Sequence, residues 1–260
     1  MPVDLSNRLV VGISSSALFD LREGGKVFGG QGIRAYRDYM VANETVPLAP
    51  GTGFALVQAL LALNRHAPSP DAPLVEVVVM SRNSPETGVR ILNTIRSHGL
   101  AISRSVFTGG EPLASYTEAF DVDLFLSTSE EDVQRVVDAS SCAAAVLYPP
   151  PEGYSPPTDQ VRFAFDGDAV LFSEASEITF KRDGLGAFHA SEDLARDVPM
   201  PEGPFAKFLL KIAKLKESLP EQVEYSSIRI AVVTARNAPA DVRVIQTLRS
   251  WNVYVPSHNV

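Results

Sequence analysis

Short apolar runs alternate with amphipathic stretches along most of this chain, and no other feature constrains the fold as strongly. Residues 8–13, 74–80 and 122–126 are short and mainly apolar, so we expect buried strands there. Residues 84–98 carry apolar side chains at helical spacing behind Ser84, which suits a helix N-cap. Strands that alternate with helices predict an α/β fold, in which helices cover both faces of a parallel sheet in a three-layer sandwich.

A proline-rich stretch divides the chain. Residues 149–160 contain five prolines and predict a linker between an N-terminal half, residues 1–148, and a C-terminal half, residues 161–260. Within the second half, residues 173–226 are polar and only partly helical in pattern, which indicates an insert. The glycine pairs within residues 24–30 predict a hairpin or a loop.

Two segments of the chain resemble each other and predict two related halves. Arg82-Asn83 and Arg236-Asn237 each follow an apolar strand, and the residues after them match at several positions once Gly88 is skipped. The shared pattern predicts two copies of one strand–turn–helix unit, with the turn at the carboxyl end of a strand, where open α/β sheets bind ligands. Convergence between short units is the alternative. Because the chain ends soon after the second copy, we expect the second half to be incomplete at its C-terminal end.

An acidic turn follows the predicted strand at residues 161–165. Asp166 and Asp168 stand two positions apart at the strand end, where their charges repel unless a cation lies between them. Oxygen ligands on a hard divalent cation point to Mg²⁺, and Gly167 lets the backbone approach it closely. An ordinary turn and a calcium loop are the alternatives, although the apolar residues 169–171 argue against calcium.

Composition excludes several classes of protein. The single cysteine rules out a disulfide framework and a cysteine-based zinc site. The net charge of −8 opposes binding to nucleic acid, which needs a basic surface. No apolar run is long enough to cross a membrane, and the first residues lack a secretion signal. We therefore expect a cytoplasmic protein with neither nucleic-acid nor membrane partners, and the sequence leaves a homo-oligomer open.

The segment from Asp166 to Phe172 resembles motif I of the haloacid-dehalogenase-like (HAD-like) phosphotransferases, and with Ser173 and Glu177 it is similar to the cytosolic type I 5′-nucleotidases. Further collinear matches lie at residues 13–19, 108–110, 123–127, 203–204, 233–236 and 247–251. The resemblance implies a Rossmann-like (HAD-like) fold, and it assigns the insert at residues 173–226 to the family's cap.

The resemblance also implies a reaction, the Mg²⁺-dependent hydrolysis of nucleoside 5′-monophosphates to nucleoside and phosphate. Asp166 matches the nucleophile that forms an aspartyl-phosphate, and Asp168 matches the general acid and base. Both residues belong to the implied Mg²⁺ site. Thr234 matches the motif II hydroxyl that binds a phosphoryl oxygen, and backbone N–H groups at Gly167 and Ala235 complete the phosphate site.

The sequence departs from the family pattern after Thr234. The family's later motifs supply a lysine for the phosphate and acidic residues for Mg²⁺, but no lysine follows Thr234 here and the only later carboxylate side chain is that of Asp241. Three explanations compete: a truncated form, a cation supplied by Lys207 or Lys181, and a relative without activity.

Weak or absent catalysis is therefore expected for these residues alone. Substrate contacts are expected from Lys207, Phe205 and Arg236, with the Phe205 ring able to stack on a base. A non-catalytic nucleotide-binding or interaction protein on the same scaffold is the main alternative function. A phosphatase for another small phosphomonoester is the third.

Overall fold

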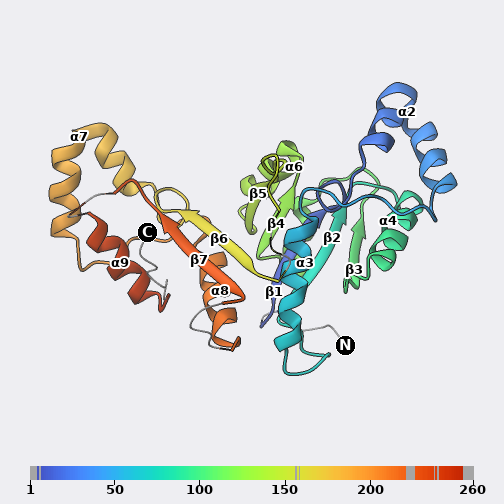
Figure 1. Ribbon diagram of the computed structural model, residues 1–260. Coiled ribbons are helices and arrows are strands. Elements are labelled where there is room, and N and C mark those ends of the chain that lie inside the picture. The colour runs from blue at the N-terminus through green and yellow to red at the C-terminus, as the bar shows by residue number, and fades with distance from the viewer. Residues whose placement is uncertain are drawn as a thin grey trace. The chain divides into compact units, whose positions relative to one another are not determined.

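The computed structural model describes Leu5 and residues 7–155, 157, 159–220, 226–236, 238 and 240–253. It divides into two compact units, unit 1 at Met1–Val161 and unit 2 at Arg162–Val260 (Figure 1). The predicted linker at residues 149–160 lies just before this division. None of the described helices is long and apolar enough to cross a membrane.

Unit 1 is built on a five-stranded parallel sheet. Its strands lie in the order β3-β2-β1-β4-β5 across the sheet, and each neighbouring pair is parallel. The predicted α/β class and Rossmann-like sandwich are confirmed by this sheet and the helices beside it. The elements are β1 (Leu9–Ser14), α1 (Ser15–Leu18), α2 (Arg22–Ala42), α3 (Phe54–Ala62), η1 (Leu63–His66), β2 (Val75–Ser81), α4 (Pro85–Ser97), β3 (Arg104–Phe107), α5 (Ala114–Thr117), η2 (Glu118–Phe120), β4 (Leu124–Ser127), α6 (Glu130–Asp138) and β5 (Ala143–Val146).

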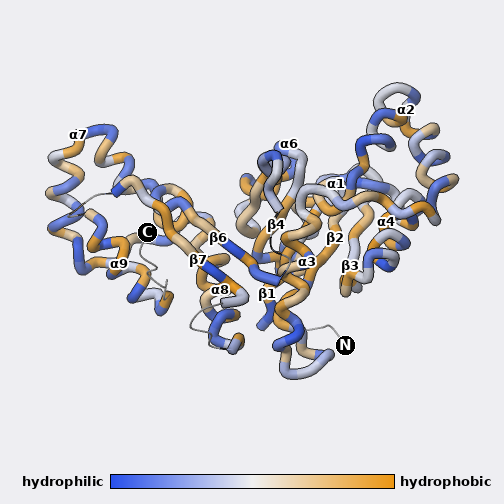
Figure 2. Tube along the Cα trace, viewed as in Figure 1, coloured by the Kyte–Doolittle hydropathy of each residue, from blue (hydrophilic) through white to orange (hydrophobic). Residues whose placement is uncertain are grey.

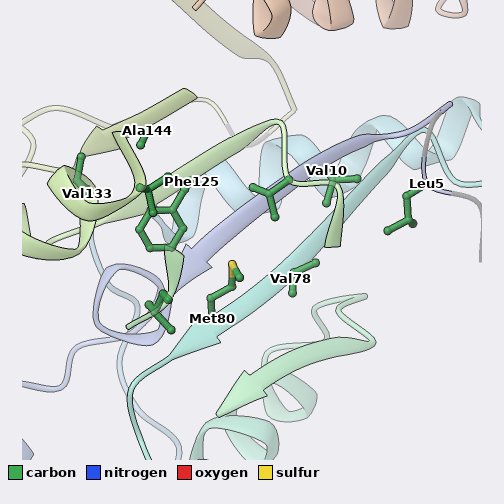
Figure 3. Packing of buried hydrophobic residues seen from close by; sticks show 10 residues of the cluster. Leu5, Val10, Val78, Met80, Phe125, Val133 and Ala144 are labelled. Carbon is green, nitrogen blue, oxygen red and sulfur yellow. The ribbon is translucent and has the colours of Figure 1, made fainter. Parts of the chain in front are cut away.

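The core of unit 1 lies around the central strands. Every residue of β1 and β2 is buried, as expected for strands covered on both faces, and β2 is mainly coloured as hydrophobic in Figure 2. A Cβ atom at Gly12 would lie 2.8 Å from the sulfur of Met80 and 3.3 Å from the Phe125 ring. Glycine at this position therefore lets the two side chains pack across β1 (Figure 3).

Unit 2 contains two paired strands, β6 (Val161–Asp166) and β7 (Ile228–Val233), and three helices, α7 (Ala175–Leu194), α8 (Ala206–Glu217) and α9 (Asp241–Ser250). Helix α8 packs on β6, because the Phe208 ring lies edge-on to Phe163 at 5.4 Å and close to Phe165 at 6.0 Å between centroids. Part of the insert predicted at residues 173–226 thus covers the sheet.

The glycine-rich residues 24–30 lie in a helix, so the predicted hairpin or loop is wrong. They belong to α2, which is bent at Gly32, where φ is 82° and ψ is −177°. Only glycine adopts this conformation readily. The sequence pattern also failed to predict β3 and β5, which are four residues long each.

The internal repeat is confirmed, and it extends over the helices and strands that the structure describes in unit 2. Apart from the short α1 and η1, unit 1 begins with the order β1, α2, α3, β2, α4, and unit 2 repeats it as β6, α7, α8, β7, α9. Helix α7 is bent at Gly184, with φ 80° and ψ 179°, and both bends are visible in Figure 1. Each bend brings two rings together edge-on, Phe28 with Tyr36 and Phe180 with Phe188.

Side-chain contacts repeat as well. Thr94 and Thr247 each accept a hydrogen bond from a distant backbone N–H, at 3.2 Å and 3.0 Å, and donate to the carbonyl four residues back. The guanidinium Nε of Arg90 and of Arg243 each donates to a distant carbonyl, at 3.1 Å and 2.9 Å. These contacts are too specific to arise by convergence of short motifs.

The contacts also correct the alignment of the two copies. The backbone N–H of Asn83 donates to the Ser81 hydroxyl at 3.2 Å, and that of Arg236 donates to the Thr234 hydroxyl at 3.2 Å. Ser81 therefore corresponds to Thr234 and Asn83 to Arg236. No residue needs to be skipped at Gly88.

Candidate active site

The acidic turn begins where β6 ends. Asp166 is the last residue of the strand and is exposed. The N–H of Gly167 donates to the carbonyl of Val233, the last residue of β7, at 3.0 Å. A Cβ atom at Gly167 would lie 3.3 Å from Cβ of Thr234. The two strands therefore bring Asp166, Gly167 and Thr234, which are distant in sequence, to one edge of the sheet.

The carboxylate of Asp166 is available for chemistry. Within the part of the chain that the structure describes, no hydrogen bond or ion pair engages it. The turn that follows is tight, because the N–H groups of Leu171 and Phe172 both donate to the Gly167 carbonyl, and Ala169 has a φ of 59°. This turn carries Asp168 back toward β7.

Asp168 is held by Arg236. The guanidinium donates from Nε to both carboxylate oxygens of Asp168, at 3.1 Å and 3.0 Å, and from Nη2 to Oδ1 at 2.5 Å. The Asp168 side chain is 26% exposed, whereas that of Arg236 is 2% exposed. Such a forked contact fixes both the position and the plane of a carboxylate.

A buried ion network continues from Arg236 into helix α7. Its Nη1 donates to Oε2 of Glu192, whose side chain is 2% exposed. The other oxygen of Glu192 accepts from Arg243 at 3.0 Å and from the Ser176 hydroxyl at 2.8 Å. The guanidinium of Arg236 also lies 5.4 Å from the centre of the Phe188 ring. We call Asp168, Arg236, Glu192 and Arg243 the ion network.

The ion network keeps Arg236 charged. Burial acts to lower the pKa of Arg236, but the hydrogen bonds and charges of Asp168 and Glu192 outweigh it and hold the pKa above its ordinary value. The four side chains carry two positive and two negative charges. Burying them is therefore tolerable, whereas removing one partner would leave a buried charge uncompensated.

The predicted substrate contacts occupy different surroundings. Arg236 is buried, and its guanidinium is committed to two carboxylates. Phe205 is half-buried just before α8, with its ring edge-on to Phe208 at 6.4 Å. Lys207 is exposed on α8, and Ala235 is exposed after β7. Lys181, the alternative cation, pairs with Glu177 at 2.7 Å on α7.

The fit of a magnesium ion depends on oxygen donors. Mg²⁺ suits one or two carboxylates together with backbone oxygens and water, and the exposed carboxylate of Asp166 and the backbone carbonyl of Asp168 are donors of this kind. Across the described residues, no group of three or more histidine, cysteine, aspartate or glutamate side chains is placed to hold a metal. The chemistry of the donors fits Mg²⁺, with the protein supplying a partial set.

Glu192 and Arg243 were not predicted as site residues. Glu192 lies in the insert with no recognisable motif around it, and only the bend of α7 brings it close to Arg236. Arg243 gave a usable signal, because the repeat pairs it with Arg90. An arginine at matching positions of two related units indicates a structural contact that both share.

Comparison with known proteins assigns the family. The family model for 5′-nucleotidases matches residues 1–258, and the chain belongs to this family. Human cytosolic 5′-nucleotidase 1B is 33% identical over 260 residues, which cover 98% of this chain and 42% of the human protein. The chain thus spans about two fifths of the length of this relative. No solved structure matches the chain significantly.

Proposed function

We propose that the protein hydrolyses nucleoside 5′-monophosphates to nucleoside and phosphate, with Asp166 as the nucleophile. Membership of the 5′-nucleotidase family supports the reaction class. The observation that carries the proposal is the close approach of the Gly167 backbone to Thr234, where an added Cβ would lie 3.3 Å from the Thr234 Cβ, beside the open carboxylate of Asp166. This arrangement suits a phosphoryl group, which needs a nucleophile on one side and hydrogen-bond donors around its oxygens.

The residues divide the reaction between them. A carboxylate oxygen of Asp166 attacks phosphorus and forms the aspartyl-phosphate, while the bond from phosphorus to the 5′-oxygen breaks. For this step Asp168 must enter the reaction protonated, and it gives that proton to the departing 5′-oxygen. It then takes a proton from the water that hydrolyses the aspartyl-phosphate, which regenerates Asp166. The Thr234 hydroxyl and the N–H group of Ala235 would donate to the phosphoryl oxygens. The N–H group of Gly167, which the sequence predicted as a further donor, is instead bonded to the Val233 carbonyl at 3.0 Å and is not free for phosphate.

Magnesium is part of the proposal. The Asp166 carboxylate and the Asp168 backbone carbonyl would hold Mg²⁺. When bound, the ion would neutralise charge on the phosphate oxygens and on Asp166. We expect phosphate release to stop on chelation of Mg²⁺ and to return when the ion is restored.

Nucleotide binding without catalysis is the second candidate function. It is favoured by the small number of metal ligands, because the described residues supply no third carboxylate beside Asp166 and Asp168. A cytosolic location is proposed by analogy with the human relative, whose name places it there. A homo-oligomer and the absence of nucleic-acid and membrane partners remain predictions.

Phosphate release from AMP by the full-length protein tests the proposal. We expect release with Mg²⁺, none with a chelator, and loss of release in Asp166→Asn. Equal rates for wild type and Asp166→Asn would show that Asp166 is not the nucleophile. Saturable binding of AMP without phosphate release would support the second candidate instead.

A further inference from the structure

The ion network is present in only one of the two related units. The repeat pairs Asp168 with Ser16, because each stands two residues after the last residue of its strand, Asp166 of β6 and Ser14 of β1. The carbonyls of Gly167 and Ser15 also accept hydrogen bonds from Phe172 and Phe19, with one extra residue in the turn of unit 2. It pairs Arg236 with Asn83, as shown above. The remaining acidic position, Glu192, corresponds to Met40, since Arg243 contacts Glu192 at 3.0 Å where Arg90 contacts the Met40 sulfur at 3.8 Å.

Three charged positions of unit 2 are therefore neutral together in unit 1. In place of the link from Arg236 to Glu192, unit 1 has a single hydrogen bond from the Tyr36 hydroxyl to Asn83, at 3.1 Å. The shared contacts of Thr94 and Arg90 nevertheless form in unit 1 as those of Thr247 and Arg243 do in unit 2. The shared framework thus assembles without an ion network.

Because the shared framework forms without the ion network, the network needs a role other than folding. Buried ion pairs contribute little net stability, because desolvation offsets their attraction. They do impose geometry, and the forked contact of Arg236 fixes both oxygens of Asp168. Glu192 fixes Arg236 in turn, from the other side of its guanidinium. The chain of contacts runs from the bent helix α7 to the acidic turn.

We propose that Arg236, braced by Glu192, is the positioning residue of the reaction, and that it acts by holding the Asp168 carboxyl group at the site of proton transfer. This inference rests on the proposed function, since it assumes that Asp168 exchanges a proton with the 5′-oxygen. The Arg236 side chain is only 2% exposed, so it cannot contact substrate directly. The same contacts make α7 the element that sets the reactivity of the acidic turn.

The test compares two substrates of the full-length protein by their kcat/KM values, which report the steps up to departure of the leaving group. AMP needs a proton on its leaving oxygen, whereas para-nitrophenyl phosphate releases a stable phenolate without one. We expect Arg236→Gln to lower kcat/KM for AMP by roughly 10- to 100-fold and that for the aryl phosphate by less than about threefold. Arg236→Lys, which keeps the charge without the fork, should recover only part of the loss.

A double variant tests whether Arg236 acts through Asp168. Asp168→Asn should show the same substrate dependence, and adding Arg236→Gln to it should cost nothing further, because the carboxyl group to be positioned is already gone. An equal loss for both substrates, or an added loss in the Asp168→Asn background, would overturn the positioning role. Wild-type protein that releases phosphate from neither substrate would instead contradict the proposed function, and this inference with it.

Two further variants separate positioning from folding. Arg236→Asn combined with Glu192→Met installs the residues of unit 1, which already coexist in a folded framework, so it should fold and still show the loss specific to AMP. Arg90→Gln removes a buried arginine of unit 1 and serves as the matched control, with both kcat/KM values expected within about twofold of wild type. A loss specific to AMP in Arg90→Gln would overturn the inference.

Discussion

The two units share one chain plan but differ in what surrounds their strands. In unit 1, β1 and β2 are buried at every residue. In unit 2, β6 and β7 alternate between buried and exposed residues, and Val233 is 62% exposed. The same succession of strand, bent helix, helix, strand and helix therefore forms with either five described strands or two. Local contacts within the repeat, such as those of Thr94 and Thr247, are enough to specify it.

The carboxyl edges of the two units show the chemical difference. Unit 1 has three consecutive serines where β1 ends and α1 begins, with Ser15 bonded to Ser81 at 2.8 Å and Ser16 bonded to Thr128 at 2.9 Å. Unit 2 has Asp166, Gly167 and Asp168 in the corresponding turn. In unit 1 these hydroxyls satisfy one another, whereas in unit 2 the glycine makes room beside Thr234 and a carboxylate is left open. Under the proposed function, unit 2 is the reactive unit and unit 1 the structural one.

The largest expected effect comes from exchanging these residues. Asp166→Ser should lower phosphate release from AMP by about 10³-fold or more, because a hydroxyl without a base is a poor nucleophile. Ser14→Ala, at the matching position of unit 1, should leave the rate within about twofold. Measured rates that fall equally in both variants would mean that both units take part in the reaction.

A smaller and equal effect is expected at the paired threonines. Thr94→Val and Thr247→Val each leave a buried N–H unpaired, that of Leu48 or of Met200, and should cost about 1–3 kcal/mol each. Hydrogen exchange under urea, resolved by peptide, reports each unit separately, and fluorescence of Trp251 adds a probe in unit 2. Thr179→Val on α7, where the lost hydrogen bond to the Ala175 carbonyl is exposed, is the control and should cost under about 0.5 kcal/mol. A cost in one unit alone would break the comparison.

The two helix bends should respond alike but more weakly. Gly32→Ala and Gly184→Ala place a side chain at φ near 80°, where nothing surrounds the added Cβ, so the cost of about 1 kcal/mol comes from the backbone alone. Local hydrogen exchange in α2 and α7 measures it. Gly25→Ala, in α2 with ordinary helical geometry, should be neutral or stabilising. If Gly32→Ala stabilised α2, the bend would not be intrinsic to the fold.

The smallest effect concerns the ion pair of Asp20 with Arg22 in unit 1. Arg22 lowers the pKa of Asp20 from 3.8 to about 2, through a side-chain hydrogen bond above all. Because the folded pKa is lowered, the stabilisation is present above about pH 4 and is lost as the pH falls toward about 2. Asp20→Asn should lower Tm by no more than about 2 °C near pH 6, since water screens an exposed pair, and by less near pH 2. A difference that grew on acidification would contradict this sign.

Much of the fold could be predicted because its signals are local. Ser84 caps α4 as expected, and the apolar runs at residues 74–80 and 161–165 are strands. The short strands β3 and β5 carry too few residues for a pattern. The first part of α2, around the glycine pairs, was missed because glycine is a poor helix former, and tertiary contacts overrode that tendency.

The site was only partly predictable for a related reason. Strand ends can be predicted from the sequence, and they place Asp166, Gly167, Asp168 and Thr234 near one edge of the sheet. The link from Arg236 to Glu192 spans 44 positions and depends on the bend of α7, so no local pattern marks it. Comparing the two copies residue by residue would have drawn attention to Arg243 through its match to Arg90.

The central claim is that Asp166 accepts the phosphoryl group. Rapid acid quenching of the full-length protein during turnover of AMP with Mg²⁺, followed by mass spectrometry of its peptides, tests this directly. The account predicts one added phosphoryl group on the peptide that contains Asp166, and none in Asp166→Asn. Phosphate release with the phosphoryl group on another residue, or on no residue at any quench time, would contradict it.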